Sequence, residues 1–265
     1  MRRLWIGLTF LVFALLLGAP VVRIAMGAWD EGWRGFANGL TRPEAVHALA
    51  MTGLIVAAVT VINTFFGVIF SMYLVRAAWL GPRLKKLLNS IVDLPFAVSP
   101  VIGGLMIVLL LGPDSALGGL LGAAGIKIVY ALPGMILATL FVTFPLVIRE
   151  VMPVLQEIGT QQEEAASMLG AYGWTTFRRV TWPQIRWSVV YGVVLTVARS
   201  LGEFGAVLVV SGNILFKTQT ATTLVYQDVE NFSLTSANAV ALVLAAGSVA
   251  LLLLMEWAKS RQKHV

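Results

Sequence analysis

Cysteine is absent from the 265 residues, and charged and histidine side chains are scarce. Without cysteine the chain can form no disulfide, no thiolate metal site and no cysteine nucleophile. Charged residues make up 12% of the chain and hydrophobic residues 58%, whereas ordinary soluble domains have about 25% and about 45–50%. So few charges could not cover the surface of a water-soluble fold of this size. The composition, with a mean hydropathy of +0.86, therefore argues against a soluble enzyme and favours a membrane protein.

Six apolar stretches are long enough to cross a bilayer, which takes roughly 20 residues of helix. Uninterrupted runs of this length predict helices, because lipid offers no partner for the backbone groups of irregular segments. The sequence therefore predicts an all-α, polytopic membrane protein that forms one domain over residues 1–265. The predicted spans are residues 4–22, 48–75, 91–112, 128–148, 187–211 and 239–255. The first run, which follows Arg2 and Arg3, also has the pattern of a secretory signal peptide.

Arginine and lysine predict the orientation of these spans. Thirteen of the nineteen basic residues fall at the two termini and in the second and fourth loops, and five fall in the other loops. Arg199, the remaining one, lies inside a span. Basic residues gather on the cytoplasmic side, so we expect both termini and the long loop 149–186 there. The net charge of +6 is then a topology signal, and we expect no nucleic-acid partner.

Motifs for catalysis and nucleotide binding are missing. His47 and His264 are the only histidines, and the predicted topology puts them on opposite sides of the membrane. The chain has no H-E-x-x-H zinc pattern and no G-x-S-x-G elbow. Residues 212–218, G-N-I-L-F-K-T, lack the second glycine of a phosphate-binding loop. These absences favour a transport component over an intramembrane enzyme.

The outer segment 27–47 carries aromatic and apolar side chains at helical spacing. Trp29, Trp33, Phe36 and Leu40 would share one face, with charged residues between them. This pattern predicts a short helix in the membrane interface, anchored by tryptophan. Docking of a partner protein is the alternative interpretation.

The long cytoplasmic loop contains the segment 161–170, which reads Q-Q-E-E-A-A-S-M-L-G. Its acids lie near the N-terminal end of the predicted helix, where the helix dipole favours them, and Gly170 suits a left-handed stop. A second short helix is expected over about residues 174–180, before Pro183 interrupts the helical pattern. The small residues would let another protein approach closely. The alternative is a solvated helix that contacts nothing.

The segment resembles a known signature at this point. Glu164-Ala165-Ala166, then Gly170, then Val180-Thr181-Trp182-Pro183 have the spacing of the "EAA" motif of ABC-importer permeases. That motif ends I-x-L-P, so Val180 and Trp182 depart from it. The resemblance implies a type I importer with the MetI-like permease fold, and a coupling helix that docks on an ATPase. It assigns this ATPase-coupling role to Glu163, Glu164, Ala165, Ala166, Gly170, Arg178, Arg179 and Pro183.

Further segments resemble the sulfate and molybdate branch of these permeases. They are residues 93–100 (D-L-P-F-A-V-S-P), 127–134, 138–145, 198–206 and 210–214, whereas residues 217–232 match the branch less well. The similarity is greatest to the W-type sulfate/thiosulfate permease subunit of the bacterial inner membrane. It implies import of sulfate or thiosulfate by alternating access, together with a T-type permease, two copies of an ABC ATPase and a periplasmic sulfate/thiosulfate-binding protein.

The same resemblance implies that ATP and Mg²⁺ bind to the partner ATPase, so that this chain has no cofactor and no catalytic site. Two alternatives remain open. One is a molybdate/tungstate permease that works as a homodimer. The other is an ion-coupled carrier or a channel that needs no ATPase.

Polar residues within the predicted spans are candidates for the translocation pathway or for a subunit interface, since charges at membrane depth normally face a protein interior, a cavity or each other. Arg199 and Glu203 are four residues apart on one helix face and can meet. They would form either a structural pair or a polar element of the anion path. The complete set of candidates is Asp93, Pro95, Arg199, Glu203, Ser211, Gly212 and Asn213.

The other candidates also have two interpretations each. Asp93 could cap a helix that starts beside it, with Pro95 in the first turn, or could belong to a gate. Ser211, Gly212 and Asn213 could turn the chain, or could offer backbone N–H groups to a dianion.

Overall fold

The protein is all-helical, as predicted, over the part of the chain that the computed structural model describes, residues 2–77 and 79–262, where no strand occurs. Lys263 and His264, both assigned to the C-terminal end above, lie outside these described residues. The chain divides into two compact units, which are described separately below.

The first unit takes in the residues up to Thr52 together with Asn213–Gly247. Its helical elements are α1 (Arg2–Phe13), a π-helical turn (Ala14–Gly18), α2 (Ala19–Ala28), α3 (Gly32–Thr41), the start of α4 (Pro43–Arg76), α13 (Ala221–Glu230) and the first part of α14 (Leu234–Gln262). Ala48, Ala221 and Val240 contribute to its buried core, which brings α4, α13 and α14 together. Thr52 of α4 reinforces this core, because its hydroxyl accepts the backbone N–H of Ala221 at 2.9 Å.

The short helix predicted in segment 27–47 is present as α3, whereas its place in the membrane interface stays a prediction. Trp29, just before it, stacks on Phe36 with ring centroids 4.7 Å apart, and on Trp33 at 5.3 Å. Both tryptophans remain exposed, whereas Leu40 at the other end of the helix packs against the core of the first unit. The aromatic cluster therefore faces outward, as an interfacial anchor would.

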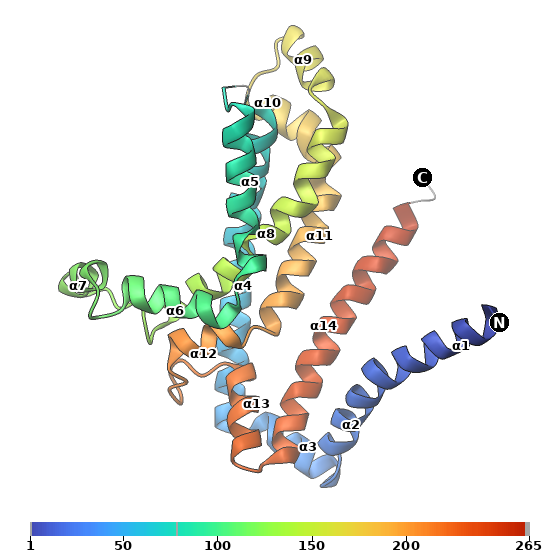
Figure 1. Cartoon of the computed structure of the whole chain (residues 1–265), viewed down its shortest axis with the longest axis vertical. Coiled ribbons are helices and arrows are strands. Elements are labelled where there is room, and N and C mark those ends of the chain that lie inside the picture. Colours follow the sequence, from blue (N-terminus) through green and yellow to red (C-terminus); the bar gives the residue numbers. More distant parts are fainter. Residues whose placement is uncertain (1, 78, 263–265) are drawn as a thin grey trace. The chain divides into compact units, whose positions relative to one another are not determined.

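The second unit comprises Gly53–Gly212 and the residues from Ser248 onward. Besides parts of α4 and α14 it contains α5 (Pro82–Ala97), α6 (Pro100–Leu111), α7 (Ala116–Ala123), α8 (Leu132–Ile158), α9 (Gln161–Met168), α10 (Trp174–Thr176), a π-helical turn (Phe177–Thr181), α11 (Trp182–Leu201) and α12 (Gly205–Ser211). Figure 1 shows α9 and α10 at one end of this unit.

Within the described residues, four helices are long and apolar enough to cross a membrane: Trp5–Ala28, Pro43–Arg76, Leu132–Ile158 and Leu234–Glu256. Two bent pairs bring the number to six if each is one span. These pairs are α5 with α6, bent by 109°, and α11 with α12, bent by 58°. The helices over predicted spans 91–112 and 187–211 are therefore broken. Pro100 predicts a kink in the first of these spans, whereas no residue pattern predicted the break in the second.

The first break has a local cause at Ser99-Pro100. Proline cannot donate a backbone hydrogen bond, and it disfavours helical geometry in the residue before it. Ser99 accordingly has ψ +138°, and Pro100 opens α6. The helix before the break begins at Pro82, not near Asp93. The largely polar residues 82–90 and the apolar residues that follow them form one continuous helix.

Pro183 does not interrupt the helix as expected. The chain remains helical from Trp174 to Leu201, and the proline lies in the first turn of α11. The wider π-helical turn at Phe177–Thr181 immediately precedes it. Such a turn changes the hydrogen-bond register, which accommodates a residue without an N–H group.

Small residues hold the long helices of the second unit close together. A Cβ atom on Gly192 of α11 would lie 2.8 Å from the Cα atom of Val147 on α8, and one on Gly67 of α4 would lie 2.8 Å from the Cβ of Val147. Close approach at small residues is a principal source of helix association in membranes. Helix α8 is therefore packed closely against both α4 and α11.

Candidate functional site

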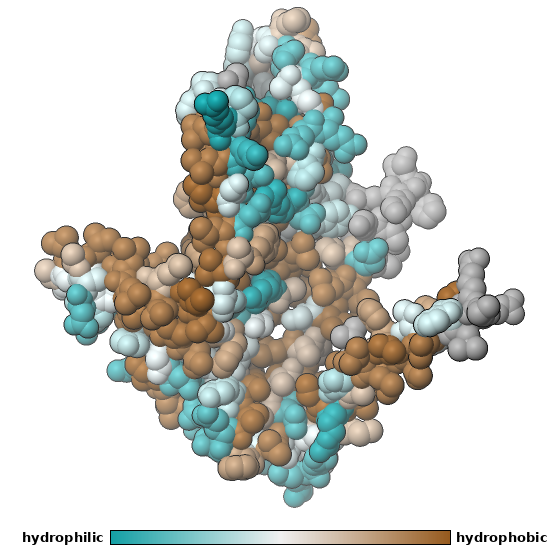
Figure 2. Space-filling view, in the orientation of Figure 1, coloured by the Kyte–Doolittle hydropathy of each residue, from teal (hydrophilic) through white to brown (hydrophobic). Residues whose placement is uncertain are grey.

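Helix α9 lies at one end of the second unit. None of its residues is buried, so no apolar side chain of α9 is packed into the protein core. At its C-terminal end Met168 is 87% exposed and Leu169 is 89% exposed. Tyr172 and Trp174, which follow the turn, are also exposed. In Figure 2 hydrophilic residues gather toward this end, whereas apolar residues cover the region of α6 and α7. An exposed apolar tip within a polar region is a feature of protein interaction sites.

The turn after α9 confirms the predicted left-handed stop. Gly170 has φ +84°, and the N–H of Ala171 donates to the carbonyl of Ala166 at 3.0 Å. Glu164, near the start of the helix, is exposed and accepts a hydrogen bond of 2.6 Å from the hydroxyl of Thr160. This polar end and the tight turn fix α9 as a short, protruding element.

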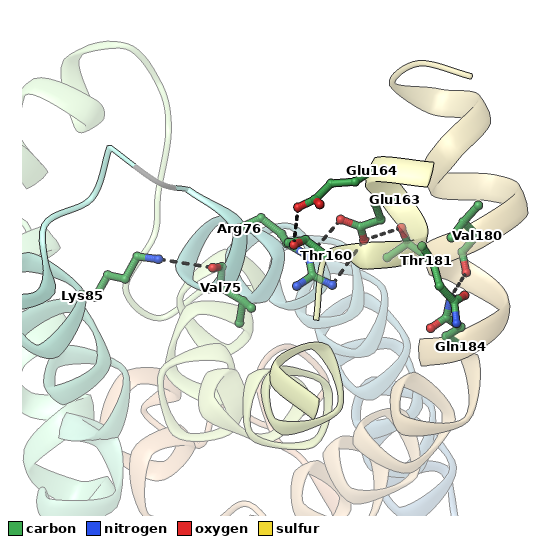
Figure 3. Close-up of polar contacts among 10 residues, drawn as sticks. Val75, Arg76, Lys85, Thr160, Glu163, Glu164, Val180, Thr181 and Gln184 are labelled. Atoms are coloured by element: carbon green, nitrogen blue, oxygen red, sulfur yellow. Dashed lines mark hydrogen bonds and ion pairs between the residues drawn. The ribbon is translucent and has the colours of Figure 1, made fainter. Parts of the chain in front are cut away.

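Glu163 points the other way, into the protein (Figure 3). Nη2 of Arg76 donates a hydrogen bond of 3.3 Å to its carboxylate, and Nε of the same guanidinium lies 3.0 Å from the other carboxylate oxygen in an ion pair. The hydroxyl of Thr181 donates to the same carboxylate at 2.8 Å. Arg76 is the last residue of α4 and Thr181 immediately precedes α11. One carboxylate thus joins the ends of three helices.

Two further polar contacts lie around this junction. Gln184 of α11 donates from its amide nitrogen to Gln162 of α9 at 2.7 Å and to the carbonyl of Val180 at 2.9 Å. Lys85 of α5 donates to the carbonyl of Val75 at 3.2 Å, close to the end of α4 (Figure 3). The polar contacts of α9 therefore reach mainly α4 and α11.

The remaining coupling candidates lie along the same end. Ala165, Arg178, Arg179 and Pro183 are exposed, and Ala166 is half-buried. The structure thus gathers the predicted coupling residues in one region but divides them. Glu163 faces inward, whereas the others are exposed or nearly so.

Asp93 does not cap a helix, because it lies near the C-terminal end of α5. Its carboxylate instead forms a two-point ion pair with Arg149 of α8, in which Nε is 2.8 Å from Oδ1 and Nη2 contacts Oδ2. Pro95 likewise lies inside α5, not in a first turn. The pair ties α5 to α8 just before the break at Ser99.

Arg199 and Glu203 meet, as their spacing predicted, with Nη1 2.9 Å from Oε2. The other oxygen of Glu203 accepts the N–H of Ala206 at 3.0 Å, in the first turn of α12. Glu203 therefore spans the break between α11 and α12. Its side chain is only 2% exposed, whereas that of Arg199 is 42% exposed. The acid is structural in this geometry, and the guanidinium remains accessible.

Ser211, Gly212 and Asn213 turn the chain. Ser211 is buried, and Gly212 ends α12 in the left-handed conformation with φ +64°. Asn213 also has a positive φ of +48°, and its amide donates to Gln227 at 3.2 Å. The turn interpretation therefore accounts for the backbone of all three residues.

Sequence reasoning missed Arg76, Thr181 and Arg149. Each partner carboxylate is far away along the chain, 87 residues for Arg76 and 56 for Arg149. For the two arginines, the only local signal was a basic residue at the end of an apolar run. Such a signal indicates the orientation of the span in the membrane but does not identify the carboxylate with which the arginine pairs. As for metals, the described residues contain no group of three or more His, Asp or Glu side chains placed to hold an ion.

Comparison with known proteins places these features in context. Residues 63–264 match the protein family described as "binding-protein-dependent transport system inner membrane component". The chain is 46% identical over 256 residues to the sulfate transport system permease protein CysW of Synechococcus elongatus, covering 97% of this chain and 88% of the relative. It is 44% identical to CysW of Escherichia coli, over 79% of this chain and 71% of the relative.

A less similar relative and a solved structure also match the chain. The sulfate transport system permease protein CysT of Escherichia coli is 35% identical over 95% of this chain and 88% of its own length. Among solved structures, a bacterial alginate ABC transporter in complex with a periplasmic protein contains a chain with a TM-score of 0.78. The match covers 98% of this chain and 96% of that one at 17% identity, so it concerns the fold.

Proposed function

The chain belongs to the family of inner membrane components of binding-protein-dependent transport systems, and from this premise we propose that it imports sulfate or thiosulfate as a permease subunit. It is a multi-pass membrane protein with the MetI-like fold of ABC transporter permeases. The observation that carries the substrate is the 46% identity to a sulfate permease over nearly the whole chain.

The protruding α9 is the element through which the subunit would contact an ATPase. Its exposed Met168 and Leu169 supply apolar contact area, and the exposed Glu164 supplies a charge beside it. Ala165 and Gly170 are small, so they would allow a close approach of the partner's backbone. Arg178 and Arg179, exposed on the following turn, would flank the contact. This assignment makes the α9 end cytoplasmic, together with both termini.

Arg199 is the strongest candidate for contact with the anion inside the membrane. An accessible guanidinium midway along a span is too costly to face lipid, so it would face a second permease subunit or the pathway. A guanidinium also matches the geometry of an oxyanion and stays charged at any working pH. Glu203 would hold it in position from within the protein, across the break that starts α12.

The complete transporter would contain partners that supply what this chain lacks. We propose a second permease of the T type, two copies of an ABC ATPase and a periplasmic sulfate/thiosulfate-binding protein. ATP and Mg²⁺ would bind to the ATPase, and this chain would perform no covalent chemistry. Its own task would be alternating access, driven by movement of α9.

Uptake in proteoliposomes tests the proposed substrate. The complex, reconstituted with its binding protein, should accumulate labelled sulfate when ATP is enclosed on the ATPase side, and thiosulfate should compete. Competition by molybdate alone would favour a molybdate permease. Sulfate uptake that persists without the ATPase would contradict an ATP-driven mechanism.

Crosslinking tests the docking of α9. Because the chain has no cysteine, Ala165→Cys introduces a single thiol at an exposed position of the helix. It should crosslink to cysteines placed on the ATPase surface. Gly122→Cys, exposed at the end of α7, is the matched control and should not. A functional complex in which neither thiol crosslinks would contradict the docking assignment.

A further inference from the structure

We propose that Arg76, Glu163 and Thr181 form a mechanical link that passes the movement of α9 to helices α4 and α11. Glu163 is thus a positioning residue that acts through its own chain and does not contact the ATPase. This inference rests on the proposed function, in which α9 is moved by a partner.

The geometry of the link is that of a fixed joint. Two guanidinium nitrogens of Arg76 face the two carboxylate oxygens of Glu163, Nη2 through a hydrogen bond of 3.3 Å and Nε through an ion-pair contact of 3.0 Å, and the hydroxyl of Thr181 donates a second hydrogen bond at 2.8 Å (Figure 3). Two-point contact between arginine and a carboxylate restricts orientation as well as distance. The side chains of Arg76 and Glu163 are only 16% and 22% exposed, so water competes weakly for these bonds.

Apolar packing cannot replace this joint, because α9 has no buried residue. The helix is held by its chain connections and by polar contacts, of which those of Glu163 are the most buried. Gln162 makes a second contact with α11, but through an exposed amide pair. A force applied to the apolar tip of α9 would therefore reach the membrane-spanning helices largely through Glu163.

The helices that receive the force are packed as one body directly beneath the joint. Val68 of α4, Val151 and Leu155 of α8, and Ile185 of α11 share one buried cluster. Val75, next to Arg76, packs against the same cluster. Because packed cores resist continuous deformation, a displacement at the joint would move these helices together.

The two adjacent acids thereby have separate tasks. Successive residues of a helix point about 100° apart, so Glu163 and Glu164 cannot face the same partner. Glu164 is exposed, and its carboxylate accepts a local hydrogen bond from the side chain of Thr160, four residues earlier. The structure assigns the outward role to Glu164 and the inward role to Glu163, although the sequence presents them as a pair.

The test compares coupling between ATP hydrolysis and uptake in the reconstituted complex. Glu163→Gln keeps an oxygen that can accept from Thr181 but removes the charge that holds Arg76. We expect the amount of sulfate imported per ATP hydrolysed to fall at least about fivefold, the lower end of typical coupling effects. The amount of bound ATPase and the crosslink from Ala165→Cys should stay unchanged. Thr181→Val should act in the same direction with a smaller effect.

A charge exchange separates the link from a general loss of structure. Arg76→Glu combined with Glu163→Arg restores an ion pair, so it should recover coupling relative to either single variant. Glu157→Gln, an exposed acid on α8, is the matched control and should couple as the wild type does.

Three results would overturn the proposal. They are a wild-type coupling ratio in Glu163→Gln, loss of the bound ATPase in that variant, or no recovery in the charge exchange. The second result would identify Glu163 as a docking contact. Wild-type uptake is measured first, since its absence would refute the proposed function itself, whereas normal wild-type uptake with any of the three results refutes only the link.

Discussion

Gly104 is a point of close approach between the two broken spans, and its replacement by alanine tests how tightly α6 and α12 are packed. A Cβ atom at this position would lie 2.7 Å from the carbonyl oxygen and 3.0 Å from the Cα of Ala206. Both atoms belong to the backbone of α12, so no side-chain rotation can relieve the contact. The variant must push α6 away from α12.

The size of the effect follows from these distances. Ordinary contact begins at 3.4 Å, so the helices must separate by about 0.7 Å. Overpacking of this kind typically costs about 1–3 kcal/mol. Alanine recovers at most about 1 kcal/mol through its better helix propensity. Because both contacts are with backbone that cannot rotate away, the cost belongs in the upper part of that range, about 2–3 kcal/mol. After about 1 kcal/mol of helix propensity is subtracted, we expect Gly104→Ala to lower the free energy of unfolding by about 1–2 kcal/mol.

Gly119 provides the matched control. It lies in the interior of α7, and a Cβ atom there would meet no other atom within 4 Å. Gly119→Ala should therefore be neutral or stabilising by up to about 1 kcal/mol. Both substitutions add the same methyl group to a short apolar helix, so they differ in the close contact alone.

The assay is the thermal unfolding midpoint of the purified complex in one detergent, together with uptake in proteoliposomes. At roughly 2–4 °C per kcal/mol for chains of this size, Gly104→Ala should lower the midpoint by about 2–8 °C relative to wild type. Equal midpoints for the two alanine variants would refute the argument, since the predicted clash would then have no consequence. Reduced stability in both would point to a general intolerance of added volume.

Three other substitutions have expected outcomes. Asp93→Asn should lower the thermal unfolding midpoint, because it removes the ion pair with Arg149; since that pair is partly exposed, we expect a loss of about 1 kcal/mol in the free energy of unfolding. Exchanging the two charges should restore the midpoint. An unchanged midpoint in Asp93→Asn would mean that the pair does not hold α5 to α8. Arg199→Lys should keep the complex assembled but slow sulfate uptake roughly tenfold or more, whereas uptake at the wild-type rate would remove this residue from the anion path. Thr52→Val should lower the free energy of unfolding by about 1–3 kcal/mol, because it leaves the buried N–H of Ala221 without a hydrogen-bond acceptor. Thr52→Ser keeps the hydroxyl and should have a much smaller effect. Similar unfolding midpoints for the two variants would show that the hydrogen bond contributes little.

Much of the helical organisation could be predicted, because it depends on local information. Apolar runs of about 20 residues identify helices wherever lipid is the solvent. The left-handed stop at Gly170 and the contact of Arg199 with Glu203 also follow from nearest neighbours on a helix. The helix starting at Pro82 was missed because its polar first half lies outside the apolar run that marked the span.

The candidate site was predicted as a segment but not as a geometry. The spacing around Glu164 and Gly170 located α9, and the same spacing put Glu163 in one functional set with its neighbour. Which acid faces inward depends on Arg76, which is 87 residues away and has no pattern that links it to α9. The same holds for Asp93, whose partner Arg149 lies on another helix.

The sequence by itself determined the class of protein and the number and rough positions of its apolar segments, and it located the segment that we propose meets an ATPase. These properties depend on composition, run length and short motifs, which are local along the chain. Only the tertiary structure decided that Glu163 closes a joint between three helices, that Glu203 bridges a break, and that Asp93 pairs with α8 instead of capping α5. The physical reason is that a carboxylate takes its role from the donors that folding brings within about 3 Å, and those donors come from distant parts of the chain.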